Sequence, residues 1–495
     1  MAQQSISRNA RVAIIGAGFS GIAAATALIR DGVENFTIFE SAPGLGGTWW
    51  HNRYPGAEVD LESHIYSFSF EQYDWTRTHA EWHEILAYLN HVAQKWDLGR
   101  RIQLNEKVES AIWDDESQTY SIELSSGTNY GAFDAVISGV GFLNIPLIPP
   151  FARGDHPFPG PVCHTSRWQE GLSLENKRVG VLGTGSSGVQ IVTEATKTAQ
   201  SVTIFQLEPN WVIPKEARDF TEDERKAYSS SDTYFAERQR LYDWYDEIQR
   251  DSSHAKRDGH WNHVREQRAL DYLHGELADR PDLIELVTPK FPFESRRTVN
   301  SDSYYQAIQD PKVRIVPFGA QELTERGIRD ANGEEHELDV VVFATGFDAA
   351  NYLGGMTVRG RGGRDLHEAW EGEPSAFLGM MVPDFPNFFM MYGPNTNASP
   401  LVTFYEAQAA FIASVLSDLD DRGATTVDVS REQFESYNTW LQDRLGLTVW
   451  GETRNYFQSK TGKIVSQWPY GPEKYLQLIE QAKTNALEFD LQRVR

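Results

Sequence analysis

Two stretches of the chain carry the same order of apolar, small and polar positions. Residues 11–32 read RVAIIGAGFSGIAAATALIRDG, a short apolar run followed by a glycine-rich turn and an alanine-rich segment. Residues 178–200 read RVGVLGTGSSGVQIVTEATKTAQ and repeat that order. A short β-branched run bounded by glycine is typical of a buried strand, and the segment that follows favours a helix. Each stretch is therefore predicted to form a strand, a tight turn and a helix.

A third apolar run, ELDVVVFATGFDA at 337–349, predicts a buried strand that ends in a turn with Gly346. Strands that alternate with helices are typical of an α/β fold with parallel sheets. We expect two Rossmann-like dinucleotide-binding domains. The first uses residues 1–150 and the second uses residues 155–345. Residues 346–495 return to the first domain and form a C-terminal segment.

The region from about 215 to 285 differs from the rest of the second domain. It is charged and aromatic, as in ERQRLYDWYDEIQRD and HWNHVREQRALDYL, and its apolar positions recur at helical spacing. We predict a helical insertion. Two interpretations remain open: the insertion packs on the core with a solvated charged face, or it also helps to wall a substrate cavity.

Composition narrows the class of protein. The chain has 495 residues, 40% of them hydrophobic, with a net charge of -24, which argues against a nucleic-acid partner. No apolar run approaches the length of a membrane helix, and the N-terminus lacks the pattern of a secretion signal. The single cysteine, Cys163, rules out an intramolecular disulfide and fits a reducing compartment. We expect a soluble cytoplasmic protein without a membrane partner.

The first glycine-rich turn matches GxGxxG through Gly16, Gly18 and Gly21, with Ser20 between the last two. The glycines allow a tight turn, close approach of the backbone to a pyrophosphate, and packing of helix on strand. The following strand, FTIFE, ends in Glu40, which is placed to accept hydrogen bonds from a ribose diol. This context favours a dinucleotide site over an accidental glycine-rich turn.

The second turn repeats the signature, and its candidate cofactor contacts are Gly183, Thr184, Gly185, Ser186 and Ser187. Two dinucleotide sites in one chain indicate two cofactors, one flavin and one nicotinamide. Disulfide reductases use this pairing, but they need two redox cysteines, and Cys163 stands alone.

The segment GGTWW follows Glu40 and places Gly47, Thr48 and Trp49 where they could close over a flavin ring. Asp60 lies further along the chain. From the local sequence alone it is either a turn or cap residue or a catalytic residue.

Three longer motifs resemble the signatures of type I Baeyer–Villiger monooxygenases. The pattern F-x-G-x-x-x-H-x-x-x-W is matched by FPGPVCHTSRW at 158–168, although Gln169 follows where the family usually has proline or aspartate. The patterns G-G-x-W and Y-P-G-x-x-x-D are matched within 46–60, and ATGFD stands at 344–348. Flavin monooxygenases that oxidise nitrogen or sulfur carry a variant of the first motif and remain an alternative, with a non-catalytic FAD-binding protein as a distant one.

The resemblance implies a reaction and a set of roles. FAD, NADPH (with NADH also plausible) and O₂ would convert a ketone into an ester or lactone through a C4a-peroxyflavin. Alignment on the tyrosine pair in ESRRTVNSDSYY makes Arg297 the active-site arginine, Asp60 its partner, and His164 a residue that couples the two domains. No metal site is expected. Further cofactor contacts implied by the resemblance and the turns are Tyr66, Val108, Gln190, Leu207, Glu208, Arg296 and Asn395.

Departures from the family pattern concentrate on the nicotinamide side. Family members commonly have F-Q-R-T-P after the second domain's second strand, with the arginine and threonine on the 2′-phosphate of NADPH, whereas this chain has Leu207 and Glu208. Arg296 corresponds to a phosphate-contacting lysine of relatives, and Lys215 is a second possible cation. Arg454-Asn455-Tyr456 replaces a serine-tryptophan-tyrosine run. The preferred nicotinamide, the ketone and the oligomeric state stay open.

Overall fold

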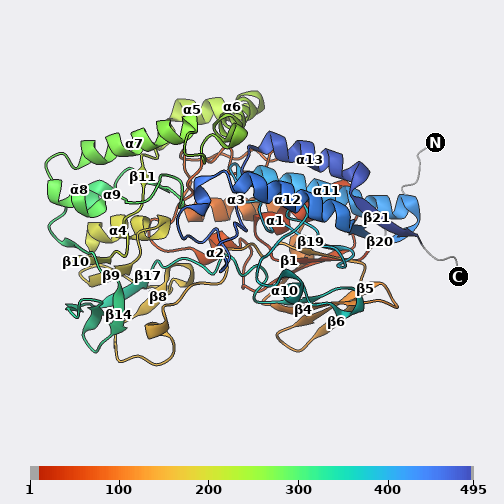
Figure 1. Cartoon of the computed structure of the whole chain (residues 1–495), viewed down its shortest axis with the longest axis horizontal. Coiled ribbons are helices and arrows are strands. Elements are labelled where there is room, and N and C mark those ends of the chain that lie inside the picture. The colour runs from red at the N-terminus through yellow and green to blue at the C-terminus, as the bar shows by residue number, and fades with distance from the viewer. Residues whose placement is uncertain (1–9, 492–495) are drawn as a thin grey trace.

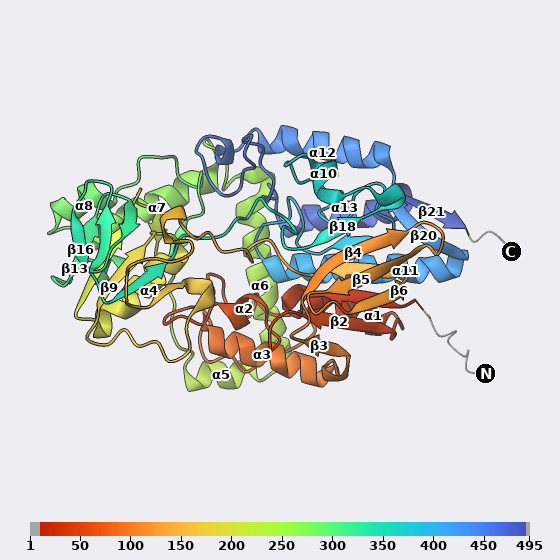
Figure 2. The same ribbon diagram turned by 90° about the horizontal axis from the view of Figure 1, so that it is seen from below.

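The computed structural model describes residues 10–491 and contains two five-stranded parallel sheets, which lie side by side in Figures 1 and 2. The first sheet has the order β19-β7-β1-β2-β3, and β1 pairs in parallel with both β2 and β7. All four residues of β1 are buried, as expected for a strand covered on both faces. The strands of this sheet are Val12–Ile15 (β1), Phe36–Glu40 (β2), Ile102–Leu104 (β3), Ala135–Ser138 (β7) and Phe388–Met390 (β19).

The second sheet has the order β13-β10-β9-β17-β8. Its edge strand β8 lies inside the FPGPVCHTSRW motif and pairs in parallel with β17. Two prolines precede this strand, and an edge is where a sheet tolerates them. The motif therefore supplies an edge strand of the second sheet and also connects the first sheet to the second. The strands are Val162–His164 (β8), Arg178–Leu182 (β9), Ser201–Phe205 (β10), Val313–Val316 (β13) and Val340–Phe343 (β17).

The chain returns to the first sheet after completing the second. Strand β19 pairs with β7, and the following helix α11 (Leu401–Arg422) lies against α1 (Phe19–Arg30) in one hydrophobic core. A four-stranded sheet beside this core is also built from both parts of the chain, because β18 (Thr357–Arg359) pairs with β4 (Val108–Asp114). The last third of the chain therefore contributes a strand to each of these two sheets.

Helices α5 (Glu222–Tyr228), α6 (Ser231–Gln249), α7 (His260–Glu276) and α8 (Pro281–Val287) form the region predicted as an insertion, which is green in Figure 1. They do not all pack on one core. Tyr234 of α6 is fully buried in the core of the first sheet, whereas Leu273 of α7 belongs to the core of the second. The insertion therefore spans the two sheets.

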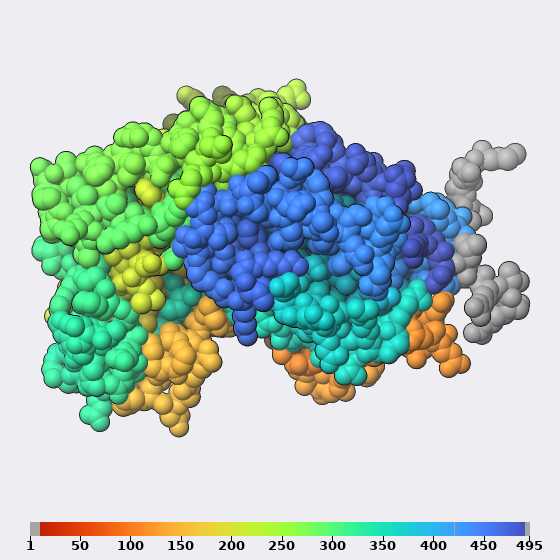
Figure 3. Space-filling model, in the orientation of Figure 1, coloured from red at the N-terminus to blue at the C-terminus, as the bar shows by residue number. Residues whose placement is uncertain are grey.

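Figure 3 shows the face of Figure 1, where the helices of this insertion and the blue C-terminal elements meet over the middle of the molecule. Within residues 10–491, no helix is long and apolar enough to span a membrane.

Candidate functional site

A cavity of about 2120 Å³ is lined by residues at the ends of strands of both sheets. Both glycine-rich turns reach it, from the carboxyl ends of β1 and β9. Parallel α/β sheets bind ligands at this edge because the strands end there and the helix N-termini begin. The insertion supplies a further wall through Tyr245, Trp261 and Val264. Of the two interpretations of the insertion, the structure therefore favours the one in which it lines the cavity.

The first turn is tightly built around backbone contacts. Gly16 has a φ of +98°, in the region that favours glycine, and a Cβ on Gly21 would lie 1.9 Å from the carbonyl oxygen of Gly16. Gly21 therefore packs helix α1 on strand β1 and does not line the cavity, whereas Gly16, Gly18 and Ser20 do.

Glu40 ends β2 and lines the cavity, but its carboxylate is already engaged. The two oxygens accept hydrogen bonds from the backbone N–H groups of Ala17 and Ala42, each at 2.8 Å. The side chain is buried, and these bonds tie the glycine-rich turn to the end of β2. A carboxylate has further lone pairs, so this arrangement leaves capacity for a ribose hydroxyl.

The second turn repeats the packing of the first. A Cβ on Gly188 would lie 2.2 Å from the carbonyl oxygen of Gly183, so this glycine lets α4 (Ser186–Thr198) pack on β9 (Arg178–Leu182). Gly185 differs, because a Cβ there would meet no atom of residues 10–491 within 4 Å and would project into open space. Gly185 lines the cavity, as do Gly183, Thr184, Ser186, Ser187 and Gln190.

The GGTWW segment forms the short helix α2 (Thr48–His51) beside the first turn. The indole Nε1 of Trp49 donates to the hydroxyl of Tyr66 at 3.2 Å, and the two rings meet edge to face. Gly47, Thr48, Trp49, Tyr66 and Val108 all line the cavity. The aromatic pair thus forms an apolar wall next to the first glycine-rich turn.

Arg297 and Asp60 form an ion pair at 2.7 Å, although 237 positions separate them in the sequence. The nitrogen is Nη2 of the guanidinium, and the exposed part of the Arg297 side chain belongs to the cavity wall. Asn300 donates to the backbone carbonyl of Asp60 at 3.1 Å and holds the aspartate in place.

Burial alone would lower the pKa of Arg297, but Asp60 and, after it, the phenols of Tyr456 and Tyr392 raise it above its ordinary value. The guanidinium therefore stays charged at every working pH. The second carboxylate oxygen of Asp60, Oδ1, is buried without a hydrogen-bond donor in the described part of the chain. A buried acceptor without a donor at a cavity wall marks a place where a bound molecule would complete the hydrogen bonding.

Tyr54 connects the segment that carries Asp60 to helix α4. Its hydroxyl donates to Oε1 of Gln190 at 2.6 Å and lies 3.0 Å from Oγ of Ser187. The amide of Gln190 in turn donates to the backbone carbonyl of Glu58 at 3.1 Å. The segment that carries Asp60 is thus linked to helix α4, which begins at the second glycine-rich turn, through one short hydrogen-bond network.

His164 lies outside the cavity wall and links strand β8 to the turn after β17. The backbone N–H of Ser166 donates to Nδ1 at 3.1 Å, so the proton of the ring is on Nε2, which donates to the carbonyl of Gly346 at 3.0 Å. Burial lowers the pKa of His164 to about 4. The ring is therefore neutral near pH 7.

The end of β10 carries the departures from the family pattern. The carboxylate of Glu208 pairs with Nη2 of Arg296 at 2.5 Å, and Leu207 is 81% exposed beside them. Lys215, the other cation considered for this place, is buried and pairs with Glu58 at 2.8 Å. Lys215 is therefore already neutralised by a carboxylate.

Of the residues predicted to contact a cofactor or to act in catalysis, Gly21, His164 and Asn395 are not brought to the cavity. Asn395 makes other contacts, and its role toward a cofactor stays a prediction. Its side chain is buried, and its amide donates to the backbone carbonyls of Ile464 and Gln467 at 3.0 and 3.1 Å. These bonds fasten the segment YGPNTN to a C-terminal loop, which no local pattern in the sequence could indicate.

Sequence reasoning missed several aromatic residues of the cavity wall. Tyr392, Tyr405, Trp450 and Tyr456 come from the C-terminal third, and Trp244 and Trp261 come from the insertion, where their rings meet edge to face. The one available signal was the place of Arg454-Asn455-Tyr456, which aligns with a cofactor-contacting run. The amide of Asn455 ties this segment to Ser295, two residues from Arg297.

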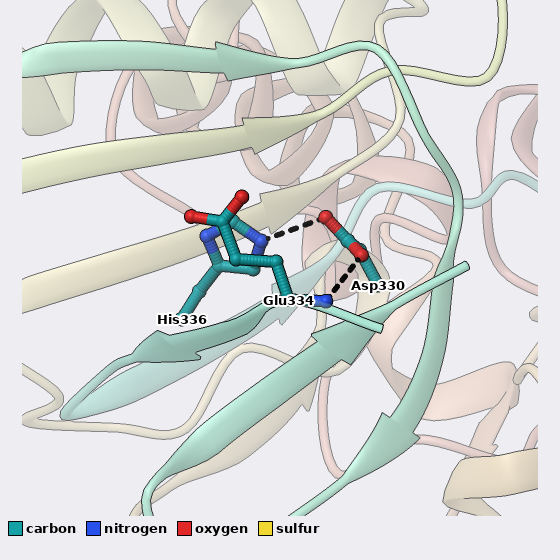
Figure 4. Close-up of side chains that lie close together, drawn as sticks. All are labelled: Asp330, Glu334 and His336. Atoms are coloured by element: carbon teal, nitrogen blue, oxygen red, sulfur yellow. Dashed lines mark hydrogen bonds and ion pairs between the residues drawn. The ribbon is translucent and has the colours of Figure 1, made fainter. Parts of the chain in front are cut away.

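One group of metal-ligating residue types lies close together in residues 10–491, namely Asp330, Glu334 and His336 (Figure 4). Its members already satisfy one another. Asp330 accepts from the backbone N–H of Glu334 and from Nε2 of His336, while Glu334 pairs with Arg314. The group stabilises the turn between β15 (Gly327–Asp330) and β16 (Glu335–Glu337), away from the cavity.

Comparison with known proteins identifies the family. The flavin-binding monooxygenase-like family model matches residues 9–222. A Baeyer–Villiger monooxygenase of Pseudomonas aeruginosa is 33% identical over 97% of this chain and 91% of its own length. One of Streptomyces coelicolor is 33% identical over 94% of this chain and 90% of its own length.

The fold agrees with this finding. The crystal structure of cyclohexanone monooxygenase from Rhodococcus sp. Phi1, bound to NADP⁺, has a TM-score of 0.87 at 27% identity and covers 98% of this chain and 99% of its own. The α/β fold with two Rossmann-like domains is confirmed, and so is the resemblance expressed by the sequence motifs. The chain belongs to the Baeyer–Villiger monooxygenase family.

Proposed function

We propose that this protein is an FAD-dependent monooxygenase that uses NADPH and O₂ to insert one oxygen atom into a ketone, giving an ester or lactone. The observation that carries the proposal is the Arg297–Asp60 pair at 2.7 Å on the wall between the two glycine-rich turns. The reaction needs a permanent positive charge at this place, and oxidation of an amine or sulfide does not.

The residues of the first turn fit FAD. Gly16 and Gly18 let the backbone approach a pyrophosphate, helix α1 begins there, and Glu40 keeps lone pairs for a ribose. Trp49 and Tyr66 lie where the ring system would be covered. When bound, the flavin supplies the redox chemistry and the activation of oxygen.

The second turn fits a nicotinamide dinucleotide. The open space beside Gly185 admits a pyrophosphate at the start of helix α4, where free N–H groups favour an anion. Buried Thr298 Oγ1 and Asn300 Oδ1 have no hydrogen-bond partner in residues 10–491, and both residues line the same cavity. These orphaned polar atoms support a bound molecule at this side.

Arg297 would stabilise the negative charge that develops on the carbonyl oxygen of the ketone as it is attacked. A guanidinium is suited to this task because it keeps its proton. Asp60 holds the orientation of Arg297 and limits the free-energy penalty of keeping a cation among buried side chains. The Tyr54–Gln190 hydrogen bond would keep the Asp60 segment in register with the nicotinamide side.

His164 would couple the two sides without transferring a proton. Its contact with Gly346 joins the FPGPVCHTSRW motif to the ATGFD turn, and burial lowers its pKa to about 4, which supports a role of the neutral ring through this hydrogen bond. The buried, lone Cys163 fits a cytoplasmic location for the enzyme.

The test is conversion of a panel of cyclic, aliphatic and aryl ketones by the FAD-loaded protein with NADPH in air, followed by mass spectrometry of the products. We expect at least one ester or lactone with one added oxygen atom. Sulfoxides or N-oxides from a parallel panel, with no ester from any ketone, would make the protein a heteroatom monooxygenase instead. Binding of both cofactors without any oxygenation would indicate a non-catalytic FAD-binding protein.

The variant Arg297→Ala separates the role of the arginine from that of the fold. We expect ester formation to fall by about 10²–10³ because a preorganised charge is lost, while NADPH oxidation continues with release of hydrogen peroxide. Product and peroxide are quantified against NADPH consumed. Arg314→Ala, which removes a surface ion pair with Glu334, is the matched control. Ester formation at the wild-type rate in Arg297→Ala would contradict the assignment.

A further inference from the structure

The adenosine end of the nicotinamide site carries an ion pair, Glu208–Arg296, where a phosphate-binding cluster of cations would be needed for strict use of NADPH. The pair lies at 2.5 Å and both residues line the cavity, together with Leu207 and Thr184 of the second turn. Thr184 Oγ1 donates to the backbone carbonyl of Glu208 at 3.0 Å, which fixes Glu208 close to the glycine-rich turn.

The position of Glu208 in the fold defines which part of the dinucleotide it would meet. Strand β10 follows helix α4, so its carboxyl end is the place where a Rossmann fold binds the adenosine ribose. A carboxylate there accepts hydrogen bonds from the ribose hydroxyls of NADH, whereas an arginine there accommodates the 2′-phosphate of NADPH. This chain has both groups, and they neutralise each other.

Arg296 also contacts an aromatic ring, in addition to Glu208. Its guanidinium lies 4.5 Å from the ring centre of Phe291, and its Nε is buried without an acceptor in the described residues. A 2′-phosphate would have to displace Glu208 from Arg296 or bind beside a carboxylate of the same charge. A ribose diol could donate to Glu208 while the ion pair stays intact.

Most cations of the cavity wall are already engaged in ion pairs. Lys215 pairs with Glu58 at 2.8 Å, Arg268 with Glu216 at 2.6 Å, and Arg297 with Asp60. Leu207 has no hydrogen-bond donor in its side chain. Within residues 10–491, three arginines of the cavity wall form no ion pair: Arg153, Arg167 and Arg454.

We propose that the Glu208–Arg296 pair adapts the adenosine-ribose subsite to NADH, so that this enzyme binds and uses NADH at least as well as NADPH. The proposal rests on the proposed function, since it concerns the donor of hydride for the same reaction. It assigns Glu208 as the residue that accepts the 2′-hydroxyl and Arg296 as the residue that keeps Glu208 in position.

The test measures binding as well as turnover. Isothermal titration of the FAD-loaded protein with NAD⁺ and with NADP⁺ gives the ratio of dissociation constants, and kcat/KM for NADH and NADPH is measured with one accepted ketone. We expect NAD⁺ to bind at least as tightly as NADP⁺ in the wild type. Binding of NADP⁺ more than about tenfold tighter than NAD⁺ would overturn the proposal and would point to one of the unpaired arginines.

Glu208→Gln keeps the shape of the side chain and frees Arg296 for the phosphate. We expect NADP⁺ to bind about tenfold more tightly, because one charged hydrogen bond is gained, and NAD⁺ to bind about threefold more weakly, because its ribose hydroxyl loses a charged acceptor. The matched control is Glu334→Gln. Glu334 is exposed and pairs with Arg314 at 2.8 Å outside the cavity, so this variant should change neither dissociation constant. Unchanged NADP⁺ binding in Glu208→Gln would contradict the role of Glu208.

The two proposals can fail separately. Equal or better binding of NAD⁺ without an ester from any ketone would refute the proposed reaction and leave the ribose subsite as assigned. Ester formation that depends on NADPH alone would support the reaction and refute the inference.

Discussion

The two dinucleotide sites of this molecule share one backbone design and differ in the glutamate that follows. Glu40 ends the second strand of the first site, is 4% exposed, and is held by the N–H groups of Ala17 and Ala42. Glu208 follows the second strand of the second site, has a side chain that is 56% exposed, and is held by one arginine. The first carboxylate is part of the fold, and the second can exchange its partner. The glycine signature thus gives both sites the same turn. The glutamate after the second strand of each site differs in exposure, and we expect this difference to affect which dinucleotide binds.

The largest contrast is expected at the third glycine of each turn. Gly21→Ala should abolish FAD binding, because its Cβ would lie 1.9 Å from a backbone oxygen inside the first core. Gly188→Ala meets a backbone oxygen at 2.2 Å and should remove nicotinamide binding while FAD stays bound. Visible absorbance reports FAD, and calorimetry reports the nicotinamide.

Gly185→Ala is the control for this pair, since a Cβ there meets no described atom within 4 Å. That variant should fold and bind FAD normally and lose only nicotinamide affinity. If Gly188→Ala also lost FAD, the two sites would not be separable units.

The glutamates should differ in their contribution to stability. Glu40→Gln keeps one acceptor oxygen and turns an amide NH₂ toward one of the two backbone donors, leaving a buried N–H unsatisfied. We expect the free energy of unfolding to fall by about 2 kcal/mol. Glu208→Gln should change it by less than about 0.5 kcal/mol because the side chain of Glu208 is 56% exposed and an ion pair made by an exposed carboxylate contributes little. Urea denaturation of the apoprotein checks both, and equal losses would refute the contrast.

A further expected effect concerns pH and the edge of the second sheet. Burial lowers the pKa of His164 to about 4, whereas the unfolded chain titrates near 6.5. Above pH 6.5 the residue is neutral in both states. Below it the unfolded chain takes up a proton first, so stability falls by about 1.4 kcal/mol per pH unit until about pH 4.

His164→Asn should lower this slope between pH 6.5 and 5 by about 1 kcal/mol per unit, as measured by urea denaturation at several pH values. The slope will persist in part, because His64 and His254 are also buried with pKa values lowered to about 4 and about 3. A slope identical to that of the wild type would show that His164 is accessible to protons in the folded state.

Most of the fold class followed from local pattern. Buried strands, glycine-rich turns and alanine-rich helices are encoded within about twenty residues, which is the range over which periodicity is informative. The Arg297–Asp60 pair was expected from the family resemblance, and the structure brings its two members to 2.7 Å. The sequence around Arg297 or around Asp60, taken alone, did not indicate that the two residues form a pair.

What escaped prediction depends on contacts between distant loops. Asn395 was interpreted as a cofactor contact, yet its amide bonds two carbonyls of the C-terminal loop, about seventy positions away. The pairing of Glu208 with Arg296 was not predicted either. Two adjacent arginines at 296 and 297 are by themselves typical of a charged surface, and only the fold brings them to the cavity beside Glu208. Loops have no period, so their partners are known only once the fold is known.

Because of strand β19, the first sheet can be completed only late in synthesis of the chain. Residues 388–390 pair with β7 at 136–138, and the whole second sheet, from β8 to β17, is encoded between these two partners. As the chain leaves the ribosome, the second sheet has all its strands by residue 343, while the first still lacks one. The part of the protein that begins to be made first is therefore finished last. A ribosome-stalled chain in which β17 has left the exit tunnel and β19 has not should hold a complete second sheet and an open first sheet.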